Sequence, residues 1–132
     1  MPEEKVLFLC PHNAAKSILA TAYFEKLATE RGLSFAIESA GTDPDPEIMA
    51  SVRDFLSEQG IQVTKETPSL VTQEQLDEAS KIVSIGCDLS TWNVDPSKLQ
   101  EWKDVPAPSD NLEGASELIK ERVGELLKSL TA

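Results

Sequence analysis

The feature that most constrains the fold is a run of four apolar residues, Val6-Leu7-Phe8-Leu9, followed at once by a polar loop and an amphipathic helical pattern. A short, uninterrupted apolar run is typical of a strand buried on both faces. Residues 81–85 (KIVSI) form a second such run, and 34–38 (SFAIE) is a third candidate strand. Strands that alternate with helices predict right-handed βαβ units and a parallel sheet covered on both faces.

Four segments have apolar residues at helical spacing. We predict helices from Ser17 to a stop at Gly32, over 47–59, over 73–79 and over 112–130. The segment 86–108 contains three prolines and is predicted to be irregular. With 132 residues, the chain is predicted to form one domain over 1–132 with an α/β fold.

Composition excludes several partners and sites. The formal net charge of -11 makes nucleic acid and anionic membranes poor partners. No stretch approaches the roughly 20 apolar residues of a membrane helix, and the first apolar run is too short and too acidic at its start for a signal peptide, so we expect a cytoplasmic protein. Two cysteines and one histidine cannot form a usual metal site, and no metal is expected.

Residues 10–17 (CPHNAAKS) lie where the first strand meets the first helix, the edge at which parallel α/β sheets bind ligands. Backbone N–H groups and the helix dipole at such a loop bind tetrahedral anions and stabilise a thiolate. Asn13 tolerates the left-handed conformation that the loop needs. Lys16 would add positive charge, and Ser17 would donate to the Cys10 sulfur. The alternative is that Cys10 merely ends a buried strand and Asn13 merely makes a turn.

VLFLCPHNAAKS resembles the phosphate-binding loop of the low-molecular-weight protein tyrosine phosphatase superfamily, whose pattern is cysteine, five residues, arginine and serine. The form CxHNAxxS is closer to its arsenate reductase branch. The resemblance continues in ESAGTDPDPEI, FLSEQGI and KIVSIGCD, and it covers roughly the first 90 residues well.

The resemblance implies a three-layer α/β/α fold with a four-stranded parallel sheet. It implies a Cys10 nucleophile, assisted by Ser17, that attacks arsenate or phosphate. The implied anion-binding residues are Pro11, His12, Asn13, Ala14, Ala15 and Lys16. Cys87 resembles the second cysteine of the reductases, and a disulfide with Cys10 would require Cα atoms within about 7 Å. No cofactor is implied beyond an external thiol, which a glutaredoxin, a thioredoxin or a small thiol would supply.

Two positions depart from the family pattern. Lys16 replaces an arginine and loses its bidentate grip on two oxygens, which weakens transition-state stabilisation more than binding. Ala107 stands before Pro108, where the family carries an aspartate as general acid. Loss of that acid costs about 10²–10⁴ in rate for a poor leaving group. Asp104 and Asp110 are the nearby candidates to replace it, and their alternative is a pair of solvated loop acids.

The sequence therefore leaves several functions open. The first is a cysteine-dependent oxyanion enzyme like arsenate reductase, impaired by Lys16 and Ala107. The second is a degenerate module that binds phosphate or a phosphoprotein without turnover. A slow tyrosine phosphatase and a phosphocysteine carrier rank below these. His12 is assigned to the rim of the loop rather than to a catalytic base, because adjacent loop side chains usually diverge.

Overall fold

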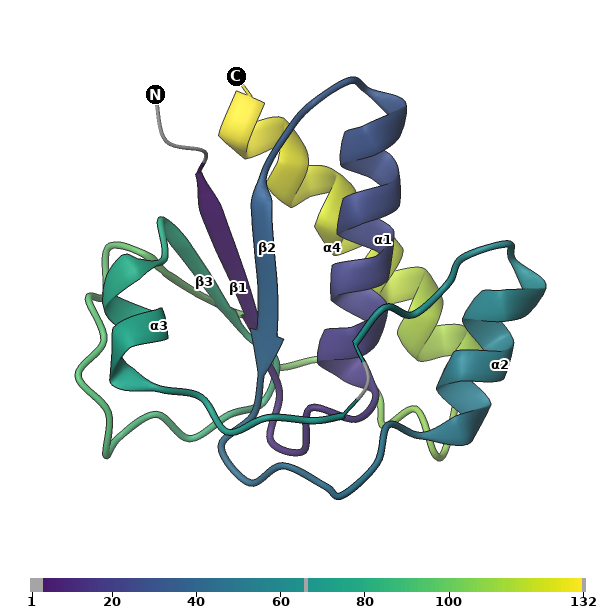
Figure 1. Cartoon of the computed structure of the whole chain (residues 1–132), viewed down its shortest axis with the longest axis horizontal. Helices are drawn as coiled ribbons and strands as arrows, with labels where there is room; N and C mark the ends of the chain where they lie inside the picture. Colours follow the sequence, from purple (N-terminus) through teal and green to yellow (C-terminus); the bar gives the residue numbers. More distant parts are fainter. Residues whose placement is uncertain (1–3, 66, 132) are drawn as a thin grey trace.

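The computed structural model describes residues 4–65 and 67–131. In chain order these residues form β1 (Lys5–Leu9), α1 (Lys16–Glu30), β2 (Ala36–Ala40), α2 (Ala50–Glu58), α3 (Gln73–Glu78), β3 (Lys81–Ser84), β4 (Leu99–Glu101) and α4 (Leu112–Thr131). The strands form one parallel sheet in the order β2-β1-β3-β4. Helices α1, α2 and α4 lie on one side of the sheet and α3 on the other, which gives three layers (Figure 1).

Strand β1 contributes side chains to both hydrophobic cores. Val6 and Phe8 belong to the core under α1, α2 and α4, whereas Leu7 and Leu9 belong to the core under α3. Successive side chains of a strand point to opposite faces, so a strand covered on both sides must be apolar at every position. The uninterrupted apolar run at the start of the sequence is therefore explained by helices on both faces.

The larger core is organised around aromatic rings. Phe8 contacts Phe24 of α1 edge to face, with ring centroids 5.6 Å apart, and Trp102 with centroids 6.1 Å apart. Trp102 is 1% exposed, so it is a core residue. The apolar stripe predicted for the last helix is buried or half-buried along its length, and α4 packs against α1 over the same side of the sheet (Figure 1).

The structure corrects three sequence-based boundaries. Strand β2 spans Ala36–Ala40 rather than 34–38, and α2 begins at Ala50 rather than at residue 47. The segment predicted to be irregular contains β4, whose three residues are half-buried or exposed and have no apolar run. Pairing with β3, and not local sequence, makes this segment a strand.

The register of the sheet places the loop after β1 at a shared edge. Leu9 pairs with Ala40 of β2 and with Ser84 of β3, so the three strands end at the same level. Cys10, Gly41 and Ile85 therefore begin three loops side by side. No helix within the described residues is long and apolar enough to cross a bilayer.

Candidate active site

The Cys10 thiol lies at the centre of a small hydrogen-bond network. Its sulfur is 3.0 Å from Ser17 Oγ, and the Ser17 backbone N–H donates to it at 3.3 Å. Asn13 Nδ2 donates to Ser17 Oγ at 2.8 Å, so the hydroxyl proton of Ser17 is available to the sulfur when Cys10 is ionised. Cys10 is 3% exposed, and both Asn13 and Ser17 are fully buried. These contacts hold the Cys10 sulfur at a fixed position beside the Ser17 hydroxyl and N–H.

The loop turns its carbonyl groups outward. Backbone N–H groups of the next segment donate to them: Asp43 to Pro11 at 2.7 Å, Asp45 to His12 at 3.0 Å and Met49 to Ala14 at 3.0 Å. In a planar trans peptide the N–H points opposite to the C=O. The N–H groups of His12, Asn13 and Ala15 therefore face the inside of the loop, which is the geometry of an anion cradle.

Helix α1 begins within the same loop. Its N-cap residue is Ala15, which has no side-chain cap, and the first turn contains no acidic residue. Exposed N–H groups at a helix N-terminus attract anions, and an acidic cap would compete with them. The start of α1 is thus free to hold an oxyanion beside Cys10.

Two residues adopt backbone conformations or positions that the cradle requires. Asn13 has a φ of 50°, in the left-handed region that asparagine tolerates. Gly41 packs directly against the loop, because a Cβ built there would lie 2.6 Å from the carbonyl oxygen of Pro11. The glycine of the SAGT segment is therefore a contact requirement of the site.

The segment after α2 holds Asn13 from the other side. Ser69 N–H donates to Asn13 Oδ1 at 3.0 Å, and Lys65 Nζ donates both to Ser69 Oγ at 2.9 Å and to Ser39 O at 3.1 Å. Burial lowers the pKa of Lys65, and the nearby Glu38 carboxylate opposes this effect. Sequence reasoning missed Lys65 and Ser69, because they lie more than fifty residues from Asn13 and carry no local signal.

The second cysteine lies in the same cluster. Two effects raise the pKa of Cys87 to about 11: burial of the thiol, which is the larger, and the negative charge of Cys10. Hydrogen bonds from the Ser84 and Thr42 hydroxyls and the positive charge of Lys16 act in the opposite direction. The Lys16 ammonium points toward this loop, since a Cβ added at Gly86 would lie 3.9 Å from its Nζ.

The fold thus gathers side chains from three loops at one edge. Cys10 and Lys16 come from the first loop, Thr42 from the second and Cys87 from the third. Both cysteines are free thiols in this structure. Thr42 was not singled out from the sequence, although the SAGT segment that contains it was. Within the described residues, no group of three or more His, Cys, Asp or Glu side chains could hold a metal ion.

The electrostatic coupling of the two thiols can be measured. We expect Cys10→Ser to increase the rate of Cys87 alkylation at pH 8 to 9 severalfold, because the substitution removes the neighbouring negative charge that favours the protonated thiol. Iodoacetamide labelling with peptide mass spectrometry from pH 7 to 10 would record it. If the pH dependence of Cys87 alkylation is unchanged in this variant, the charge on Cys10 does not affect the pKa of Cys87.

The two candidate general acids occupy different surroundings. Asp104 is exposed and forms an ion pair with Arg122 of α4, and this hydrogen bond lowers its pKa. A carboxyl with a lowered pKa is ionised at neutral pH, which is the wrong state for donating a proton. Asp110 is exposed in the turn before α4, where its N–H donates to Ala107 O at 2.9 Å. No hydrogen bond within the described residues joins either carboxyl group to the Cys10 loop.

The His12 side chain is directed away from Cys10. Its Nδ1 is 3.0 Å from Asp43 O and 3.4 Å from Asp45 Oδ1, and the side chain is 57% exposed. These contacts place the ring on the outer rim of the loop. They support the rim assignment rather than a Cys–His pair.

Comparison with known proteins agrees with this geometry. Residues 5–132 match the model of the low molecular weight phosphotyrosine protein phosphatase family. The chain belongs to this family.

Proteins similar to this chain include arsenate reductases. The chain is 26% identical over 118 residues to a Halobacterium salinarum protein named "Putative arsenate reductase". This match covers 80% of this chain and 83% of the relative. A thioredoxin-dependent arsenate reductase from Corynebacterium glutamicum is 30% identical with a TM-score of 0.84, over 98% of this chain but only 63% of that one. An arsenate reductase from Archaeoglobus fulgidus is 31% identical with a TM-score of 0.69, and the match covers 95% of this chain and 97% of that one.

Proposed function

We propose that this protein is a cysteine-dependent oxyanion enzyme of the arsenate reductase type, in which the Cys10 thiolate attacks arsenate held by the 10–17 loop. The observation that carries the proposal is the second thiol, Cys87, close enough to Cys10 for charge on one to alter the pKa of the other. Hydrolysis of a phosphate ester needs one nucleophilic cysteine, whereas reduction of arsenate needs two electrons, which a pair of thiols supplies.

The proposed reaction has three steps. The Cys10 sulfur bonds to arsenic as one arsenate oxygen leaves as water. The Cys87 thiolate, its proton lost to solvent, then attacks the Cys10 sulfur; a disulfide forms, and the electron pair of the sulfur–arsenic bond stays on arsenic, which leaves as arsenite. An external thiol donor reduces the Cys10–Cys87 disulfide to two thiols. Lys16 favours the second step by stabilising the Cys87 thiolate.

The chemical class of the thiol donor is a separate question. The Corynebacterium neighbour is thioredoxin-dependent, which supports a thioredoxin. The chain has two cysteines and no third one after Cys87, which favours a small thiol or a glutaredoxin. Arsenite formation measured in parallel with each of the three donors would decide between them. A cytoplasmic location remains a prediction from the sequence.

Lys16 also supports an alternative function, a module that binds phosphate or a phosphoprotein without turnover. Its single ammonium cannot clamp two oxygens of a transition state as a guanidinium does. Under this alternative, calorimetric titration would detect phosphate binding, while no arsenite and no phosphate ester hydrolysis would be measurable with any thiol donor. A slow tyrosine phosphatase would instead hydrolyse aryl phosphates without a second thiol.

The Lys16→Arg substitution distinguishes an impaired enzyme from such a module. If Cys10 turns over oxyanions, we expect about a tenfold higher kcat for p-nitrophenyl phosphate, because a bidentate guanidinium stabilises the transition state better. KM should change less, since the ammonium already supplies the charge for ground-state binding. Lys26→Arg, on the outer face of α1, is the matched control. Activity that stays undetectable in Lys16→Arg would favour the binding module.

A further inference from the structure

Strand β2 is at the edge of the sheet and pairs with β1 on one side only. Ala36 N–H donates to Glu4 O, and Cys10 N–H donates to Ala40 O, so the polar groups of alternate residues face β1. The backbone groups of Ile37 and Ser39 therefore face the other way. One of these outward-facing groups, the Ser39 carbonyl, already accepts a hydrogen bond from the Lys65 ammonium, in the place where a neighbouring strand would donate a backbone N–H.

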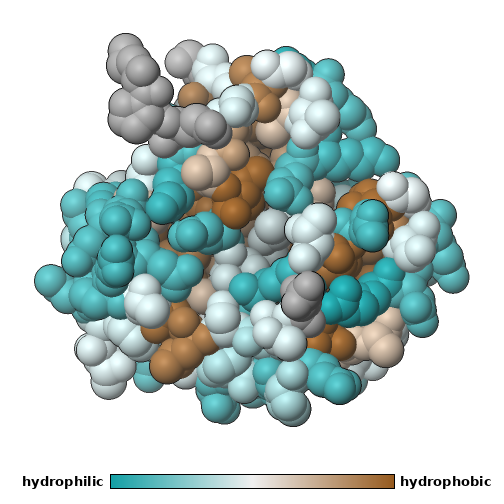
Figure 2. Space-filling model, in the orientation of Figure 1, coloured by the Kyte–Doolittle hydropathy of each residue, from teal (hydrophilic) through white to brown (hydrophobic). Residues whose placement is uncertain are grey.

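A groove lies beside the first part of this edge, at Ile37. The residue after β2, Gly41, already pairs with the segment 69–71. The groove has a volume of about 620 Å³ and lies between β2, the outer face of α1 and the segment after α2. Phe35 and Ile37 form one wall, Ile61 the opposite wall, and Ala22 and Ala28 part of the floor. Figure 2 shows hydrophobic surface on both sides of a hollow on this face of the molecule.

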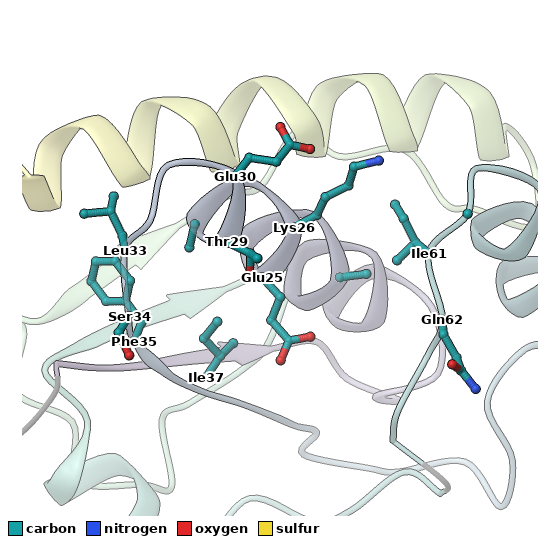
Figure 3. Close-up of a pocket in the computed structure, with 13 residues that line it drawn as sticks. Glu25, Lys26, Thr29, Glu30, Leu33, Ser34, Phe35, Ile37, Ile61 and Gln62 are labelled. Carbon is teal, nitrogen blue, oxygen red and sulfur yellow. The ribbon is translucent and has the colours of Figure 1, made fainter.

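Two glutamates of α1, Glu25 and Glu30, line the groove. Glu25 extends from α1 into the space between Ile37 and Gln62, whereas Lys26 and Glu30 point from the same helix toward α4 (Figure 3). Glu25 is exposed at the surface, and the partial burial of its carboxyl raises its pKa; no ion pair or hydrogen bond within the described residues involves this carboxyl. Glu25 also lines two smaller hollows that continue toward Ser39 and Lys65.

The strand edge, the apolar walls and the Glu25 carboxylate together fit one kind of ligand. The unpaired backbone groups of a strand edge form hydrogen bonds with another extended chain. Apolar walls bind the aliphatic side chains at alternate positions of such a chain, and a carboxylate in the groove attracts a cationic side chain. We propose that the groove between β2 and α1 is a docking site for an extended peptide segment of a partner protein, which pairs with β2 through Ile37 and presents a lysine or arginine to Glu25. This binding surface is separate from the chemistry of Cys10 and does not depend on the proposed function.

The probe is a blocked octapeptide of alternating valine and lysine, with a valine–glutamate peptide of equal length as its counterpart, added to the full chain. We expect the lysine peptide to bind and the glutamate peptide to bind at least about fivefold more weakly. Glu25→Gln should weaken binding of the lysine peptide by about fivefold or more. Glu117→Gln, at an exposed glutamate of α4 that does not line the groove, is the matched control and should leave the affinity unchanged.

Amide hydrogen exchange locates the bound peptide. Saturating lysine peptide should slow exchange at Ile37, whose N–H faces the groove, by about tenfold or more, while Ala36 and Glu38, already bonded to β1, stay unchanged. The proposal is overturned if Ile37 is not protected, if both peptides bind equally, or if Glu25→Gln and Glu117→Gln behave alike. It is also overturned if Ile37 becomes protected with rising protein concentration alone, because the occupant is then a second copy of this chain.

Discussion

Substitution of Cys10 by serine is expected to reduce both arsenite formation and p-nitrophenyl phosphate hydrolysis by about 10⁴-fold or more. The serine hydroxyl fits the same place beside Ser17, but it does not ionise near neutral pH and cannot act as the nucleophile. The measurement is a steady-state assay of both reactions with excess thiol donor. Any residual rate above that limit in either reaction would contradict the assignment of Cys10.

The folded state of this variant is its control. The sulfur-to-oxygen change is nearly isosteric and keeps a polar atom for the Ser17 N–H, so we expect the thermal midpoint to move by only a few degrees. Phosphate binding measured by calorimetry should persist, because the loop amides and the start of α1 are unaltered. A variant that folds and binds phosphate but does not turn over separates loss of the nucleophile from collapse of the loop.

Substitution of Cys87 by serine is expected to divide the two activities. Arsenite formation should fall by about 100-fold or more, since arsenic bound to Cys10 then has no neighbouring thiolate to release it. Hydrolysis of p-nitrophenyl phosphate should change by less than about threefold, because that reaction uses water after the first step. The paired assays, run with the same enzyme preparation, give the ratio directly.

The outcomes for Cys87→Ser discriminate between mechanisms. Equal loss of both activities would mean that Cys87 supports the loop and is not a second nucleophile. Arsenite formation that persists with a small thiol would mean that the external thiol attacks the Cys10 adduct directly. Ser84→Ala is the matched control: it removes a hydrogen bond that favours the Cys87 thiolate, so it should slow arsenite formation while keeping both thiols.

Local sequence was sufficient for much of the fold. The apolar run of β1, the helical spacing of α1 and α4, and the buried run of β3 each depend on burial of nearby residues, and each was predicted close to its observed bounds. Strand β4 was not predictable in this way. Its three residues, LQE, have no apolar pattern, and only the neighbouring edge of β3 makes them a strand.

In the candidate site too, local features could be predicted from the sequence and long-range contacts could not. The sequence by itself determined that Cys10, Asn13 and Ser17 share a loop between a strand and a helix, because they are adjacent and their residue types suit an anion cradle. Tertiary structure alone decided that Lys65 and Ser69 brace Asn13 and that Thr42 contacts Cys87. The physical reason is the parallel sheet, whose register brings the ends of β1, β2 and β3 to one level and so makes neighbours of loops that are far apart in the chain.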